Sequence, residues 1–132
     1  MRPHKRLFPL CCALLLSAGL LVTGAGAAGR VSMSYLYFGS PSAYVDRVLQ
    51  TGGALQEISP NYFNLNADGS LNVTGTGISA FVEEMHAMGV RVVPFLSNHW
   101  DRELGVKALE NRTALADQIV QAVKQYDLDG VN

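Results

Sequence analysis

The segment Val90-Arg91-Val92-Val93-Pro94-Phe95-Leu96 is almost continuously apolar. A short apolar run of this kind is typical of a β-strand that is covered on both faces, as in a parallel sheet flanked by helices. The residues before it predict such a helix, which Gly89 ends. The apolar side chains of this helix recur at the spacing i, i+3, i+4 and i+7, and they are Ile78, Phe81, Val82 and Met85.

The amino-terminal side predicts another strand and helix. Residues 31–38 mix β-branched, aromatic and small side chains and form a strand. Ser40 then offers an N-cap oxygen and Pro41 suits the first helical position. The helix that follows ends at Gly52-Gly53.

A second strand covers residues 55–63 and is interrupted by Pro60. After it, Asp68-Gly69 lies between Leu65 and Leu71 and predicts a tight hairpin turn.

The last helix begins near Asn111, and its apolar stripe comprises Leu115, Ile119, Ala122, Val123 and Tyr126. Residues 127–132 then resemble the approach to a fourth strand. The order β-α-β-α-β-α-β implies right-handed parallel units. Two α/β architectures use it: an open doubly wound sheet, or the amino-terminal part of a (β/α)8 TIM barrel with about three βα units and the start of strand four.

The first 27 residues have the pattern of a secretory signal peptide. Basic residues at positions 2, 5 and 6 precede the uncharged stretch 7–22, and Ala25-Gly26-Ala27 is a small-residue cleavage site. This segment holds both cysteines, three of the ten basic residues and none of the eleven acidic ones. We therefore expect residues 28–132 to form an exported, acidic, cysteine-free domain.

That composition excludes several classes of protein. Without cysteine, the exported part is neither a disulfide scaffold nor a cysteine-ligated metal site. Its acidic balance argues against nucleic acid as a partner. It has no apolar run near the roughly 20 residues that span a bilayer. We expect no metal, no cofactor and no membrane partner after signal cleavage.

Candidate binding residues lie where the predicted strands end, because ligands of parallel α/β folds meet the carboxyl ends of the strands. They are Tyr35, Tyr37, Tyr62, Phe63, Asn98 and Trp100. Aromatic faces beside amides suit a sugar, which offers both an apolar face and hydroxyls. The alternative is that strand aromatics such as Tyr35 and Phe63 fill the core, whereas Trp100 lies in a polar loop.

Three other patterns are weaker. His99, Asp101 and Glu103 suggest a metal site or an acid–base pair, but a metal centre usually needs three or more converging ligands. Residues 75–80 match a loose dinucleotide fingerprint without a strong strand before them. His86 lies at the margin of an apolar helix face, where we expect a boundary residue rather than a ligand.

The segment Tyr126-Asp127-Leu128-Asp129-Gly130-Val131-Asn132 resembles the opening of the signature of glycoside hydrolase family 18, Asp-Gly-x-Asp-x-Asp-x-Glu, with Asn at the second acidic place. That form is familiar in bacterial relatives of spore-cortex-lytic and other cell-wall or chitin-active enzymes. Residues 34–37, 58–71 and 92–97 agree with the family in order and spacing. Ser97-Asn98-His99 departs from the Ser-x-Gly-Gly of typical chitinases.

The resemblance implies that residues 28–132 are part of a family 18 catalytic domain, with Asp129 and Asn132 in the catalytic motif. The family cleaves N-acetylglucosamine-containing polysaccharides such as chitin or peptidoglycan with retention, and the substrate's own N-acetyl oxygen is the nucleophile. The general-acid Glu of the motif would follow Asn132, so we expect the polypeptide as given not to hydrolyse glycosides. The alternative is a non-catalytic carbohydrate-binding or cell-wall-associated module. Both hypotheses place the protein outside the cell or in its wall.

Overall fold

A parallel sheet forms one half of the computed structural model, which describes residues 31–132. Its strands lie in the order β1-β2-β5 and are β1 (Met33–Leu36), β2 (Glu57–Pro60) and β5 (Arg91–Val92). Ser34 pairs with Ile58, and Ile58 pairs with Val92 on its other side. The predicted parallel α/β arrangement is confirmed in these strands.

The predicted signal peptide, residues 1–27, lies outside the described residues. Within residues 31–132, none of the helices combines the length and apolar character that crossing a membrane requires.

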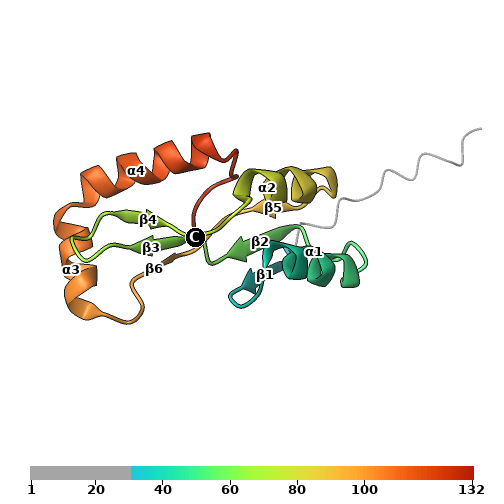
Figure 1. The fold of residues 1–132 in the computed structure, drawn as a ribbon, viewed down its shortest axis with the longest axis horizontal. Helices are drawn as coiled ribbons and strands as arrows, with labels where there is room; N and C mark the ends of the chain where they lie inside the picture. The colour runs from blue at the N-terminus through green and yellow to red at the C-terminus, as the bar shows by residue number, and fades with distance from the viewer. Residues whose placement is uncertain (1–30) are drawn as a thin grey trace, which may run out of the picture. The chain divides into compact units, whose positions relative to one another are not determined.

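A second sheet is formed by the chain segments that directly follow β2 and β5, together with one further strand. Its strands lie in the order β4-β3-β6 and are β3 (Phe63–Leu65), β4 (Leu71–Val73) and β6 (Leu96–Ser97). β3 and β6 are parallel, whereas β3 and β4 form the antiparallel hairpin that Asp68-Gly69 predicts. The predicted second and third strands are therefore each divided in two, and the two sheets lie end to end (Figure 1).

The division coincides with a change of register. Ile58 pairs with Val92, but Phe63 pairs with Leu96, so the segment from β2 to β3 holds one residue more than the facing segment. An extra residue on one strand is a β-bulge, which bends the strand and redirects its side chains.

Residues 129–132 add a further parallel segment beside the third predicted strand. The Asp129 amide donates to the Val92 carbonyl at 3.0 Å, and the Asn132 amide donates to the Pro94 carbonyl at 2.9 Å. The Leu96 amide donates in turn to the Asn132 carbonyl at 2.9 Å. This is the slanted bonding of parallel strands, and it agrees with the predicted start of a fourth strand.

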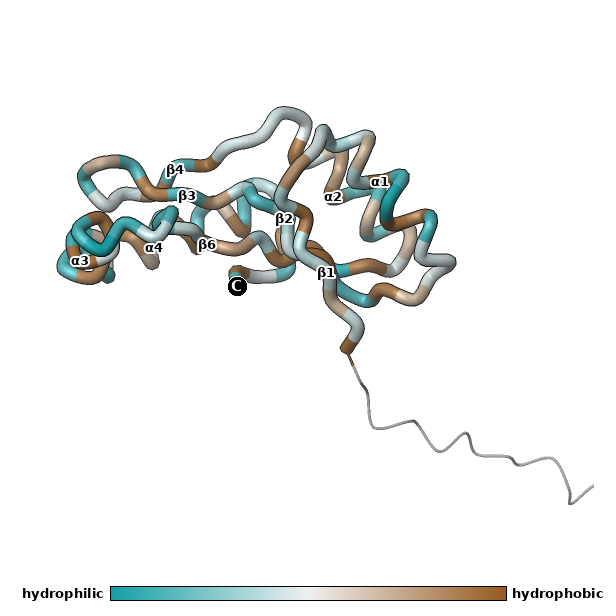
Figure 2. The backbone as a smooth tube through the Cα atoms, turned by 90° about the horizontal axis from the view of Figure 1, so that it is seen from below, coloured by the Kyte–Doolittle hydropathy of each residue, from teal (hydrophilic) through white to brown (hydrophobic). Residues whose placement is uncertain are grey.

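Two helices cover the first sheet, α1 (Pro41–Gln50) and α2 (Ile78–Ala87). α1 begins as predicted, because the Ser40 hydroxyl accepts a hydrogen bond from the Ala43 amide at 3.3 Å. α2 ends before Gly89, whose φ of 73° is the left-handed conformation that glycine adopts readily. Apolar stretches of the helices and strands meet between these layers (Figure 2), and the most deeply buried side chains include Ile58, Phe63, Val82, Met85 and Val92.

Two further helices lie beside the second sheet, α3 (Arg102–Glu110) and α4 (Arg112–Gln125). α4 is the predicted last helix, and Gln118 on it accepts a hydrogen bond from the Leu71 amide of β4 at 2.8 Å. Asn111 stands at its N-cap position, but its side chain makes no capping bond. α3 is a helix that the sequence analysis did not predict: the Asp101 carboxylate caps it by accepting from the Leu104 amide at 3.0 Å.

Candidate functional site

Aromatic rings from the first and third predicted strands meet on the sheet face opposite α1 and α2. The Tyr37 and Phe95 rings stack with centroids 5.9 Å apart and an interplanar angle of 14°. Tyr35 meets the same Phe95 ring edge-on at 5.6 Å. Tyr35 is 56% exposed, whereas its neighbour Leu36 is buried against the helices, as the alternation of side chains along a strand requires.

The loop after β6 presents Trp100 to solvent. The Ser97 hydroxyl accepts from the His99 amide at 3.0 Å, and the Asn98 carbonyl oxygen Oδ1 accepts from the Trp100 amide at 3.3 Å. The Asn98 amide nitrogen donates to the carbonyl of Asp101 at 2.9 Å. The oxygen and the nitrogen of the Asn98 side-chain amide are therefore both bonded within the loop and hold its conformation.

This loop holds two consecutive residues in the left-handed region, His99 at φ 50° and Trp100 at φ 64°. Side chains other than glycine adopt that region at a cost of roughly 1 to 2 kcal/mol per residue. The Trp100 side chain gains no packing in return, because it is fully exposed at 101%. Strained residues of this kind cluster at ligand-binding sites, where the strain maintains a binding geometry.

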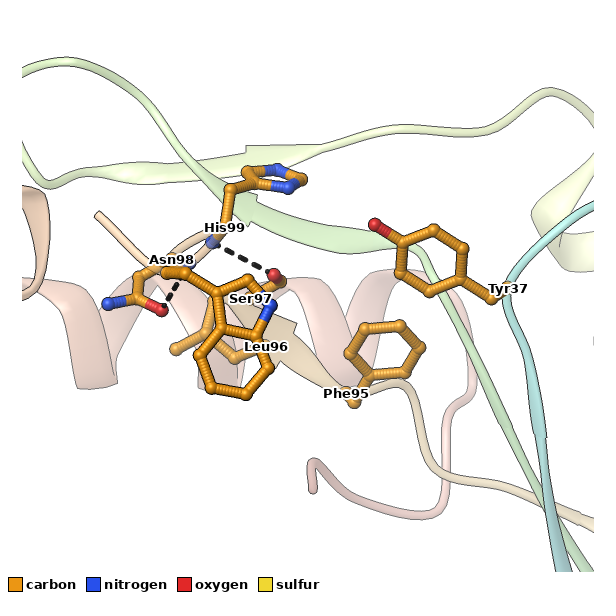
Figure 3. Close-up of a pocket in the computed structure, with 7 residues that line it drawn as sticks. Tyr37, Phe95, Leu96, Ser97, Asn98 and His99 are labelled. Carbon is orange, nitrogen blue, oxygen red and sulfur yellow. Dashed lines mark hydrogen bonds between the residues drawn. The ribbon is translucent and has the colours of Figure 1, made fainter.

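The rings and the loop line a cavity of about 450 Å³ that is open to solvent. Its lining residues are Tyr37, Phe95, Leu96, Ser97, Asn98, His99 and Trp100. Figure 3 shows the Tyr37 and Phe95 rings on one side of it and the Ser97–His99 loop on the other. The lining offers aromatic faces, two hydroxyls, one amide and one imidazole, a combination that suits a ring bearing hydroxyl and amide groups.

The two signature residues lie at different places. The Asn132 amide nitrogen donates to the Tyr35 hydroxyl at 3.0 Å, so Asn132 belongs to the same open face as the aromatic rings. Asp129 is on the helix side, where its carboxylate oxygen Oδ2 accepts from the Val92 amide at 2.7 Å and lies 2.8 Å from the His86 ring nitrogen Nε2. Asp129 therefore contacts the supporting structure rather than the cavity.

Tyr62 and Phe63 are buried instead of open. Phe63 has no exposed surface, and Tyr62 is 4% exposed with its ring edge-on to Phe81. Burial raises the pKa of the Tyr62 phenol, which stays neutral. For Phe63 this placement favours the alternative that strand aromatics fill the core, because its ring has no free face for a ligand.

The weaker patterns form no centre among residues 31–132. Asp101 caps α3, and the described His, Asp and Glu side chains include no group of three that could hold a metal ion. The sequence interpretation missed Phe95 and Ser97 as cavity residues and His86 as the partner of Asp129. The strand-end rule had been applied only to residues that follow this strand, although Phe95 and Ser97 flank its end. Nothing local in the sequence indicated the pairing of His86 with a residue 43 positions away.

The fold and the site together define an α/β protein built from parallel βα units, with an aromatic cavity at the carboxyl ends of its strands. Comparison with family models finds no match for the chain, and comparison with curated protein sequences finds none either. Solved structures do match, and those found include family 18 glycoside hydrolases.

The spore cortex-lytic enzyme SleL of Bacillus cereus superposes with a TM-score of 0.65 at 14% identity, over 76% of this chain and 26% of that one. A chitinase of Bacteroides thetaiotaomicron gives 0.57 at 22%, over 77% and 35%. The family 18 chitinase ChiB of Flavobacterium johnsoniae gives 0.55 at 19%, over 78% and 36%. The fold is thus that of part of a family 18 glycoside hydrolase, and the chain spans about a quarter to a third of these structures.

Proposed function

We propose that this chain is the amino-terminal part of an exported family 18 glycoside hydrolase that acts on N-acetylglucosamine-containing polysaccharide. Chitin and peptidoglycan are two polysaccharides of that kind. In this proposal residues 1–27 direct export, residues 28–132 belong to the catalytic domain, and the enzyme works outside the cell or in its wall. Hydrolysis is retaining and substrate-assisted.

The observation that carries the proposal is the display of Trp100. The indole is fully exposed on a strained backbone, beside the stacked Tyr37 and Phe95 rings, and packing within the chain does not account for it. Its location at the carboxyl ends of parallel strands is where ligands bind in this class of fold. In the proposal Trp100 and Tyr37 stack on sugar rings, and Asn98 holds the loop that positions the indole.

The signature residues have separate roles in this proposal. Asn132 shares the open face with Tyr35, so it lies beside the bound sugar, and its amide donates hydrogen bonds there. Asp129 supports the strand on the helix side, where its carboxylate accepts from the Val92 amide. Tyr35 holds the Asn132 side chain in place, a role that its exposed position on β1 permits.

Sugar binding is measurable on the chain itself. Trp100 is the only tryptophan, so its fluorescence reports directly on this site during titration with the N-acetylglucosamine hexamer. Calorimetry on Trp100→Ala is expected to show about tenfold weaker binding, the size of one lost stacking contact. Leu109→Ala is the matched control, because Leu109 is exposed on α3 and is not part of the cavity lining.

Equal affinities of the Trp100→Ala variant and the unmodified chain would contradict the proposed site. Cellohexaose, which lacks the N-acetyl groups, tests the substrate class, and tighter binding of cellohexaose would contradict an amino-sugar substrate. The alternative of a non-catalytic carbohydrate-binding module predicts the same binding. Only a turnover assay on the gene's full-length product separates the two.

A further inference from the structure

The Asp129 carboxylate links three elements through a single oxygen. Its Oδ2 accepts a hydrogen bond from the Val92 amide at 2.7 Å and lies 2.8 Å from Nε2 of His86 on α2. The Asp129 amide also donates to the Val92 carbonyl at 3.0 Å. Asp129 is thus joined to Val92 by both its backbone and its side chain, and to α2 by His86.

We propose that His86 is a positioning residue that fixes the register of residues 129–132 against β5. This inference rests on the proposed function, since it concerns the segment that carries the family 18 signature. His86 donates from Nε2 to the Asp129 carboxylate and holds that oxygen toward the Val92 amide. A charge-assisted hydrogen bond of this geometry is stronger and more directional than one between neutral groups.

Register matters here because successive side chains of a strand point to opposite faces. A slip by one residue would move Asn132 from the open face to the helix side and break its bond to Tyr35. Three backbone hydrogen bonds join this short segment to residues 92–96, and Gly130 adds no side-chain contact to them. The pairing at Asp129 therefore determines where Asn132 lies, three residues further along.

The surroundings of His86 support a dedicated contact. The ring is partly buried, with 32% of its side-chain surface exposed, and Asp127 faces its other nitrogen, Nδ1, at 3.8 Å. Asp127 itself has a left-handed φ of 55°, so the chain makes a strained turn as it passes His86. The strain is localised where α4 ends and the signature begins, and both flanking carboxylates face the same imidazole.

Hydrogen exchange on the full chain tests this role without any sugar. In His86→Leu, exchange of the Asp129 and Leu96 amides is expected to rise about tenfold, the effect of losing one hydrogen bond to a charged group. The Val93 amide, which donates to Ile58 between β2 and β5, is the internal control and is expected to keep its rate. His86→Gln is expected to restore protection, because its amide nitrogen can occupy the place of Nε2.

Three results would overturn the proposal: unchanged exchange at Asp129 and Leu96, an equal rise at Val93, or no rescue by His86→Gln. If His86→Leu does not fold, the nitrogen chemical shifts of His86 in the unmodified chain decide instead. A proton on Nε2 supports the proposal, and a neutral ring protonated only on Nδ1 contradicts it. None of these measurements involves sugar. The positioning role can therefore fail while the sugar-binding proposal stands, and sugar binding can fail while the positioning role stands.

Discussion

The Asn132 side chain donates a hydrogen bond to the Tyr35 hydroxyl at 3.0 Å, although the two residues are 97 positions apart in sequence. It joins the first strand to the start of the fourth across the open face, beyond the two strands between them. The Phe95 ring lies edge-on to Tyr35 on the same face. The contact therefore indicates how strongly the sheet curves, since the side chains of a flat sheet would not meet over that separation.

Replacing Tyr35 by Phe removes this hydrogen bond and leaves the ring contact with Phe95. We expect the free energy of unfolding to fall by about 0.5 to 1.5 kcal/mol, the usual net value of one hydrogen bond. Chemical denaturation measures it. Tyr37→Phe is the control, because among the described residues the Tyr37 hydroxyl has no hydrogen-bond partner. Equal losses in both variants would show that the bond to Asn132 contributes nothing.

Asp101→Ala removes the cap of α3, whose carboxylate accepts from the Leu104 amide. Losing an N-cap of this type costs about 1 kcal/mol. The Asp101 backbone is bonded to Asn98 in the loop that presents Trp100, so fraying of the uncapped helix start is expected to change the fluorescence of Trp100 in the same variant. Arg102→Ala, at the first position of the same helix, is expected to leave both nearly unaltered. A spectrum that stays unchanged in Asp101→Ala would argue against this coupling.

Phe63→Leu tests the assignment of Phe63 to the core. Its ring has no exposed surface, so the smaller side chain is expected to lower the free energy of unfolding by about 1 kcal/mol. Affinity for the N-acetylglucosamine hexamer is expected to remain the same. Phe38→Leu, at a ring that is 75% exposed, provides the comparison and is expected to be neutral in stability. A selective loss of affinity in Phe63→Leu would instead indicate a sugar contact.

Gly69→Ala tests how the hairpin tip packs against α3. An added Cβ would lie 2.8 Å from the Ala108 backbone nitrogen, and the φ of 84° adds strain. Gly53 is the matched position, with a φ of 83° and open space around its added Cβ. Gly69→Ala is expected to lower the free energy of unfolding by about 1 to 3 kcal/mol more than Gly53→Ala does. Thermal denaturation of both variants measures the difference. Identical losses would mean that the hairpin moves aside without cost.

The sequence predicted those elements that local chemistry determines. Ser40 and Pro41 start α1, Gly89 follows the end of α2, and Asp68-Gly69 forms the hairpin, because caps and turns depend on residues within one turn of chain. The strands around Val92 followed from their apolar run. The strand-end rule likewise identified the region of the cavity, including Asn98 and Trp100.

Long-range contacts account for what was missed. α3 buries only Ala108, and it is supported by its cap and by contact with the distant hairpin, where Lys107 donates to the Ala67 carbonyl at 3.2 Å. The change of register that divides the strands depends on pairing between distant residues. The burial of Phe63 depends in turn on which face of the bent strand meets the helices, and no local pattern encodes that.

The proposed function is tested most directly by mapping the bound sugar on the chain. Amide chemical shifts of isotope-labelled protein, recorded during titration with the N-acetylglucosamine hexamer, report contact residue by residue. The largest changes are expected at Tyr37, at residues 95–100 and at Asn132. In Trp100→Ala these chemical-shift changes are expected to disappear. Changes concentrated elsewhere on the molecule, or none at millimolar sugar, would contradict a carbohydrate site at the carboxyl ends of these strands.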